Sequence, residues 1–283
     1  MNKVICLNQY NRRSLKVRST IPLAALATIA LMAAAPNRAH AASGNSKVVH
    51  ATAIPAGKIP AYITAAIDSP DRPAADRALD ASRKPAQVMA FYGVAPGMRV
   101  ADLWAGGGYT TELLARIVGP GGKVYSQNGP FPEKFKKNET LWQGRLKEPG
   151  MSNVVEVSKP FGSPDLLPVA PGSLDMVFIN MNYHDLFNLG ADPATLNATV
   201  FKALKPGGVY AIVDNSAKPG AGTSETKTLH RIDEATLIKQ VEAAGFRLAA
   251  TSNVLRNPND PRTQPFWKMN HTQDRFVLKF VKP

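Results

Sequence analysis

An apolar segment that ends in aspartate and runs directly into three glycines constrains the fold of this chain more than any other feature. Residues 100–111 read VADLWAGGGYTT, and residues 112–118 have the composition of a helix. Glycines allow a sharp turn and close approach of a ligand, and free N–H groups at a helix start favour an anionic group. The pattern is typical of the first strand-to-helix turn of a nucleotide-binding α/β sheet. A glycine-rich turn without a ligand is the alternative, because such a motif alone is weak.

A dinucleotide fits this turn poorly. The dinucleotide fingerprint needs a third glycine, where this chain has Thr111, and an acidic residue at the end of the second strand. The predicted second strand, 122–127, is instead followed by Asn128. The sequence therefore argues against NAD as the ligand.

The position of Asp102, at a strand end and four residues before the first glycine, resembles the first motif of class I S-adenosylmethionine-dependent methyltransferases. Later segments resemble further strands and turns of that family, in the family's order: 173–180, 204–214, 243–246 and 275–280. The resemblance covers about residues 83–283 and extends to exported bacterial "predicted methyltransferases". It implies an α/β, Rossmann-like fold: a seven-stranded, mostly parallel sheet with helices on both faces and an antiparallel last strand.

The same resemblance implies S-adenosylmethionine as the cofactor. The residues at the family's cofactor-binding positions are Asp102, Ala105, Gly106, Gly107, Gly108, Tyr109, Asn128 and Asn180. Trp104 stands where the family usually has its first glycine, and Asn128 stands where it has an acid that holds both ribose hydroxyls. An aspartate in place of Asn128 is therefore expected to tighten cofactor binding, since charged hydrogen bonds are the stronger ones.

Polar residues after the predicted fourth strand are the candidates for catalysis: Asn180, Tyr183 and His184. Methyl transfer from a sulfonium mainly needs donor and acceptor held close and aligned, and sometimes a base. His184 could be that base near neutral pH, although local packing at a helix start is equally compatible with its position. No metal site centred on His184 is expected, because no second histidine stands at helical or hairpin spacing from it.

Two charged residues are candidates for binding the methyl acceptor. Asp185 directly follows His184, and Arg231 precedes a predicted helix at 234–244, where it could reach an anionic substrate. The acceptor is expected to be a small molecule or an envelope component. Nucleic acid is not expected as a partner, because the net charge of +13 is not concentrated in runs of basic and aromatic residues.

The first 41 residues have the features of a cleavable signal peptide. A basic segment without acids precedes an apolar stretch at 21–35, and Ala39-His40-Ala41 is typical of a cleavage site. The apolar stretch is short for a bilayer span, with a retained anchor as the alternative. Asn11-Arg12-Arg13 resembles a twin-arginine signal but also suits an ordinary basic region, so both export routes stay open. Residues 42–58 are predicted to be a flexible linker, and 59–283 the methyltransferase-like domain.

Cleavage would leave a periplasmic or secreted protein without a stable membrane anchor. It would remove the one cysteine, Cys6, and lower the formal net charge from +13 to +7 with the loss of six basic residues. The mature chain would then lack a thiol for a disulfide, a thiolate metal site or a nucleophile. Its oligomeric state is not indicated by the sequence.

Two classes of function are compatible with these features. An exported S-adenosylmethionine-dependent methyltransferase is favoured by Asp102 and the glycine turn. A non-catalytic protein that binds a nucleoside or another small ligand on the same fold is favoured by Trp104 and Asn128, and by the cytoplasmic origin of S-adenosylmethionine. A hydrolase is disfavoured, because the chain has no G-x-S-x-G nucleophile turn.

Overall fold

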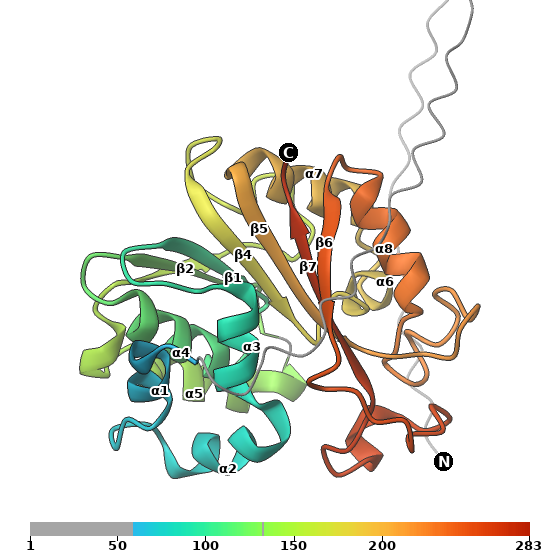
Figure 1. Cartoon of the computed structure of the whole chain (residues 1–283), viewed down its shortest axis with the longest axis horizontal. Helices are drawn as coiled ribbons and strands as arrows, with labels where there is room; N and C mark the ends of the chain where they lie inside the picture. The colour runs from blue at the N-terminus through green and yellow to red at the C-terminus, as the bar shows by residue number, and fades with distance from the viewer. Residues whose placement is uncertain (1–58, 132) are drawn as a thin grey trace, which may run out of the picture. The chain divides into compact units, whose positions relative to one another are not determined.

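The computed structural model describes residues 59–131 and 133–283 (Figure 1). The predicted signal peptide, 1–41, and the predicted linker, 42–58, lie outside the described residues. Within the described ranges, no helix is both long enough and apolar enough to cross a membrane.

A seven-stranded sheet forms the centre of the described domain (Figure 1). Its strands are β1 (Arg99–Leu103), β2 (Lys123–Asn128), β3 (Val154–Ser158), β4 (Leu174–Asn180), β5 (Leu204–Asn215), β6 (Arg247–Ser252) and β7 (Arg275–Val281). Their order in space is β3-β2-β1-β4-β5-β7-β6. The last strand, β7, runs antiparallel to both β5 and β6, while the other neighbouring pairs run parallel. The predicted Rossmann-like α/β fold is confirmed.

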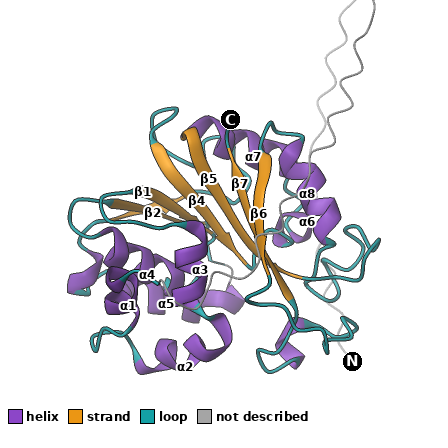
Figure 2. Cartoon of the chain, in the orientation of Figure 1, coloured by secondary structure: helices purple, strands orange, loops and turns teal. Residues whose placement is uncertain are grey.

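Helices lie on both faces of this sheet (Figure 2). The α-helices are α1 (Ala61–Ile67), α2 (Ala74–Arg83), α3 (Pro85–Tyr92), α4 (Tyr109–Val118), α5 (Lys136–Arg145), α6 (Asp185–Asn188), α7 (Pro193–Ala203) and α8 (Glu234–Glu242). Short 3-10 helices are η1 (Glu133–Phe135), η2 (Pro149–Met151) and η3 (Phe266–Lys268).

The central strand β4 shows why both faces need cover. Successive side chains of a strand point to opposite faces. Met176 and Phe178 accordingly pack into the apolar core that includes residues of α1, α3 and α4. Val177 and Ile179 pack into the core that includes residues of α7 and α8. A strand that is apolar on both sides is typical of the inside of a parallel sheet.

The strand order reverses between β1 and β4, which are neighbours in the sheet although β2 and β3 lie between them in the chain. Open α/β sheets bind their ligands beyond the carboxyl ends of the strands at such a point. The glycine turn follows β1, the segment 180–185 follows β4, and Asp214 lies near the end of β5. The fold therefore brings the predicted site segments to one edge of the sheet.

Candidate functional site

The glycine turn between β1 and α4 has two glycines with different tasks. Gly106 has a φ of 59°, and a Cβ placed there would meet no atom within 4 Å. Gly108 has a φ of 86°, and a Cβ there would lie 2.8 Å from Trp142 and from Arg145 of α5. Gly108 is thus needed for packing under α5, whereas Gly106 leaves its side of the turn open to a ligand.

Hydrogen bonds also hold the main chain of the turn at Ala105, Gly107 and Gly108, which are further predicted cofactor positions. The amide of Ala105 donates to the Gln127 carbonyl at 3.0 Å, and the amide of Gly108 donates to the Ala105 carbonyl at 3.0 Å. The carbonyl of Gly107 accepts from Arg145 Nε at 2.7 Å. These bonds fix the main-chain path past Gly106 before any ligand arrives.

The sequence predicted that the Asn128 amide faces the ribose hydroxyls. In this structure the amide bonds to the main chain of Gly106. Its Oδ1 accepts from the Gly106 amide at 2.8 Å, and its Nδ2 donates to the Gly106 carbonyl at 3.2 Å. The side chain is only 5% exposed. In this structure both ends of the amide fasten the glycine turn to β2, and the role of Asn128 in holding the ribose stays a prediction.

Asp102 also acts inside the protein and not in the open crevice. It is 1% exposed and accepts from the Thr111 hydroxyl at 2.6 Å, which joins β1 to the first turn of α4. Burial raises the pKa of Asp102 from 3.8 to about 7, although the hydrogen bond from Thr111 opposes this shift. The carboxylate of Asp102 is enclosed in this structure, and its contact with the cofactor stays a prediction.

Trp104 keeps a backbone conformation that favours glycine, with a φ of 53°. Such a conformation costs on the order of 1–3 kcal/mol and persists only where the surroundings impose it. The Trp104 amide donates to Gln127 Oε1 at 2.9 Å, its carbonyl accepts from Asn182 at 3.0 Å, and its ring lies 4.9 Å from that of Phe161. The bond from Asn182 connects the glycine turn to the segment after β4.

A small cavity of about 20 Å³ lies beside the first turn of α4. Tyr109, Thr110 and Asn180 line it, together with two arginines outside the predicted site, Arg83 and Arg275. Asn180 donates to the Thr110 hydroxyl at 3.1 Å. Asn180, at the end of β4, and Tyr109, at the start of α4, thus line the same cavity.

Arg83 and Arg275 reach this cavity from elements far apart in the chain. Arg83 ends α2 and stacks over the Tyr109 ring at 4.2 Å, and Arg275 begins β7. Burial, together with the neighbouring charge of Arg83, lowers the pKa of Arg275 to about 10. No local sequence pattern marks either arginine, because only the sheet order brings them to Asn180.

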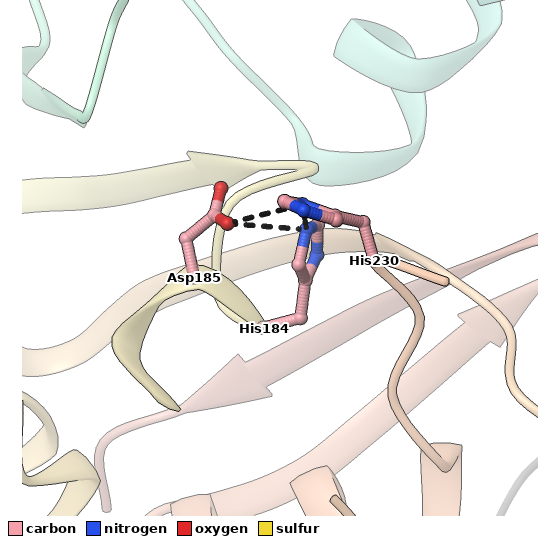
Figure 3. Close-up of side chains that lie close together, drawn as sticks. All are labelled: His184, Asp185 and His230. Carbon is pink, nitrogen blue, oxygen red and sulfur yellow. Dashed lines mark hydrogen bonds and ion pairs between the residues drawn. The ribbon is translucent and has the colours of Figure 1, made fainter. Parts of the chain in front are cut away.

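Two histidines lie close together beyond the carboxyl ends of β4 and β5: His184, which is buried, and His230, which is partly exposed (Figure 3). His184 Nδ1 lies 2.7 Å from Asp214 Oδ1, and the His184 amide donates to the other oxygen of that carboxylate at 2.9 Å. His184 Nε2 faces His230 Nδ1 at 3.2 Å. Burial opposes the charged form of His184, but the charge and hydrogen bond of Asp214 outweigh it, so the pKa of His184 is raised.

Asp185 completes this group, which we call the His–Asp–His cluster: His184, Asp185 and His230. Asp185 Oδ1 lies 3.5 Å from His184 Nε2 and 3.3 Å from His230 Nδ1. His230 comes from the loop between β5 and α8, 46 residues after His184. No metal site centred on His184 was expected because no second histidine stands at helical or hairpin spacing from it, but the fold brings His230 to His184 from 46 residues away.

Two further predicted site residues are part of the protein interior. Tyr183 is fully buried, accepts from Asn197 at 2.9 Å and donates to Gln240 at 3.3 Å, which excludes it from the open crevice. Arg231 is also fully buried and pairs with Asp260 at 2.8 Å. The internal partners of both side chains disfavour the predicted roles of Tyr183 in catalysis and of Arg231 in substrate binding, which stay predictions.

No protein-family model matches the chain. A demethylmenaquinone methyltransferase from Lactococcus lactis is 30% identical over 131 residues, which cover 46% of this chain and 47% of the relative. A protein-L-isoaspartate O-methyltransferase from Aeropyrum pernix is 34% identical over 117 residues, which cover 41% of this chain and 38% of the relative. The matched segment thus spans less than half of each of these relatives.

The fold has solved counterparts. A SAM-dependent methyltransferase from Aquifex aeolicus superposes with a TM-score of 0.53 at 19% identity, over 74% of this chain and 95% of that one. Both curated relatives are named as methyltransferases, and the fold is shared with a solved SAM-dependent methyltransferase. The resemblance to this class is confirmed.

Proposed function

We propose that the domain binds S-adenosylmethionine and transfers its methyl group to a small molecule or an envelope component. The observation that carries the proposal is the open side of Gly106 at the reversal of strand order, where α4 begins. A ligand there meets free N–H groups at a helix start and no Cβ atom. Asn180 and Tyr109 line the adjoining cavity.

The His–Asp–His cluster belongs to the acceptor end of the proposed site. Two of its residues, His184 and Asp185, lie on the segment that continues from Asn180, and Asn182 joins that segment to the glycine turn through the Trp104 carbonyl. His184 can take up a proton only at Nε2 while its Nδ1 is bound to Asp214. The two curated relatives are named for demethylmenaquinone and for protein L-isoaspartate, which differ in chemistry, so neither acceptor is carried over.

A calorimetric titration of the mature protein with S-adenosylmethionine and S-adenosylhomocysteine tests the proposal. Binding of both ligands at about one per chain is expected, followed by release of S-adenosylhomocysteine when an envelope extract is added. Absence of binding by either ligand would contradict the proposal. In the variant Gly106→Val the added side chain fills the open side of the turn. Methyl transfer by this variant in the same extract would contradict the position assigned to the cofactor.

A non-catalytic ligand-binding protein is the second candidate. It is favoured by the bulky Trp104 at the entrance of the glycine turn and by Asn128, whose amide is already used by Gly106. Such a protein would bind the nucleoside but would release no S-adenosylhomocysteine with any extract. Turnover that depends on added extract would eliminate this candidate.

We further propose that the protein is exported and works in the periplasm or outside the cell. The proposal rests on the basic segment, the apolar stretch 21–35 and Ala39-His40-Ala41. Since S-adenosylmethionine is made in the cytoplasm, an exported enzyme would need donor carried with it or supplied across the membrane. Recovery of the cleaved protein from a periplasmic extract would support export.

A further inference from the structure

The three ligand-type atoms of the His–Asp–His cluster form a nearly equilateral triangle (Figure 3). The edges are 3.2 Å between His184 Nε2 and His230 Nδ1, 3.3 Å between His230 Nδ1 and Asp185 Oδ1, and 3.5 Å between Asp185 Oδ1 and His184 Nε2. A tetrahedral zinc ion with bonds of about 2.0–2.1 Å sets neighbouring ligand atoms about 3.3–3.4 Å apart. The triangle therefore has the size of one face of a zinc coordination tetrahedron.

The hydrogen bonds around the cluster are compatible with a metal ion at its centre. When the Nδ1 proton of His184 is donated to Asp214, its Nε2 has a lone pair and no proton. Asp185 as a carboxylate also has only acceptor atoms. In the tautomer that carries its proton at Nε2, His230 likewise has a lone pair at Nδ1. A cation at the centre would satisfy all three atoms together.

The surroundings hold the candidate ligands as the second layer of a metal site does. Asp214 fixes the tautomer and the ring of His184 through Nδ1 and is itself fully buried. Asn188 donates to Asp185 Oδ1 at 2.8 Å. Carboxylate partners of histidine ligands and hydrogen-bonded carboxylate ligands are the usual support of such sites.

His230 is set in place by a strained main chain and an aromatic neighbour. Its φ of 52° is unfavourable for a histidine, and its carbonyl accepts from Asn215 at 3.2 Å. Its ring lies 5.1 Å from the ring of Trp267, which is 55% exposed. His230 and Asp185 keep 30% and 21% of their side chains exposed, while that of His184 keeps 1%. The cluster is thus open on one side to an ion and to a further ligand.

We propose that His184, Asp185 and His230 bind one divalent transition-metal ion, with zinc as the best match, and leave coordination positions open on the exposed side. Two nitrogens and one carboxylate oxygen suit zinc and the other first-row divalent ions better than magnesium or calcium, which prefer oxygen ligands. The role of the open positions rests on the proposed function. They would bind the hydroxyl or thiol of the methyl acceptor, and a bound metal lowers the pKa of such a group.

Zinc titration of the untagged, chelator-treated mature protein tests the site without any S-adenosylmethionine. The wild-type protein is expected to bind about one zinc ion per chain, and cobalt in its place is expected to give the visible absorption of a tetrahedral site. Asp185→Asn and His230→Asn are expected to weaken zinc binding by about 100-fold or more, because each removes a direct ligand and not merely its support. His230→Asn suits the main chain, since asparagine tolerates a positive φ.

His271→Asn is the matched control, because His271 is exposed, lies outside the cluster and also has a positive φ, of 63°. It is expected to bind zinc as the wild type does. Circular dichroism of the zinc-free variants verifies that they are folded. If His230→Asn does not fold, Asp185→Asn still tests the site, because asparagine keeps the shape of the aspartate side chain. Wild-type protein without a zinc ion, or both cluster variants with wild-type affinity, would overturn the metal site. S-adenosylmethionine binding is measured separately, so either proposal can fail alone.

Discussion

The amide of Asn128 holds both polar main-chain atoms of Gly106, at 2.8 Å from the nitrogen and 3.2 Å from the oxygen. The strand that carries Asn128 thereby fixes the residue whose open side is proposed to face the cofactor. The glycine turn is shaped by a side chain from the second strand, 22 residues away, as well as by its own glycines.

Asn128→Asp is expected to weaken S-adenosylmethionine binding, the opposite of what the sequence predicted. An aspartate can still accept from the Gly106 amide, but it loses the donor that serves the Gly106 carbonyl and sets a negative charge beside it. The expected cost is about 1–3 kcal/mol in the free energy of unfolding. Calorimetry and urea unfolding measure the two effects. Tighter binding by the aspartate variant would restore the ribose-binding role.

Gly106→Val is expected to abolish S-adenosylmethionine binding while the fold persists. The added side chain fills the open side of the turn and demands a φ that valine disfavours, at about 1–3 kcal/mol. Gly172→Val is the control, because Gly172 has a φ of 65° and a Cβ added to it would meet no atom within 4 Å. Equal affinity of the two variants in a calorimetric titration would remove Gly106 from the site.

Asp102→Asn is expected to gain stability relative to the wild type as the pH rises from 4 to 7. The pKa of Asp102 is raised from 3.8 to about 7 in the folded state, so its contribution to stability is complete below 3.8 and is lost as the pH rises through 7. The full change amounts to about 4 kcal/mol. Urea unfolding of both proteins at several pH values measures it.

Asp175→Asn is the control for that experiment. The pKa of Asp175 is lowered, since the bonds from Lys205 and from the Arg99 amide outweigh its partial burial. Its contribution is therefore present above 3.8 and constant from pH 5 to pH 8. A pH-independent difference between Asp102→Asn and the wild type would show that Asp102 is not held in a desolvated position.

Arg231→Met is expected to destabilise the domain by about 3–5 kcal/mol without changing S-adenosylmethionine affinity. The substitution leaves the buried carboxylate of Asp260 without its guanidinium partner. Lys218→Met serves as the control, because Lys218 is an exposed cation in the loop between β5 and α8, which also contains Arg231. A variant of Arg231 with wild-type stability but weaker acceptor binding would return this residue to the substrate site.

The mature N-terminus is expected at Ala42, after cleavage behind Ala39-His40-Ala41. N-terminal sequencing of protein recovered from the periplasm or the medium identifies it. Soluble cytoplasmic protein that retains Met1 would contradict export. Replacement of Arg12 and Arg13 by lysine distinguishes the routes, because a twin-arginine signal would lose export and an ordinary basic segment would keep it.

The fold could be predicted from local patterns. The glycine turn, the apolar strands and their order along the chain depend on short windows of sequence, because strand and helix periods and turn residues act over a few positions. The same patterns located the strand end at Asn180 and the segment after it that contains His184. They indicated an α/β sheet and the first turn of α4, and the resemblance to a known family implied the Rossmann-like strand arrangement.

The side-chain roles within the site were decided by the tertiary structure. Tyr183 and His184 are neighbours in the chain, yet one bonds to Asn197 and the other to Asp214. His230 meets His184 across 46 residues only because the loops after β4 and β5 lie at the same sheet edge. The sequence by itself determined which segments reach the site. The packing of the folded chain determined which side chains face one another there, because such contacts join residues too far apart for any local pattern to record.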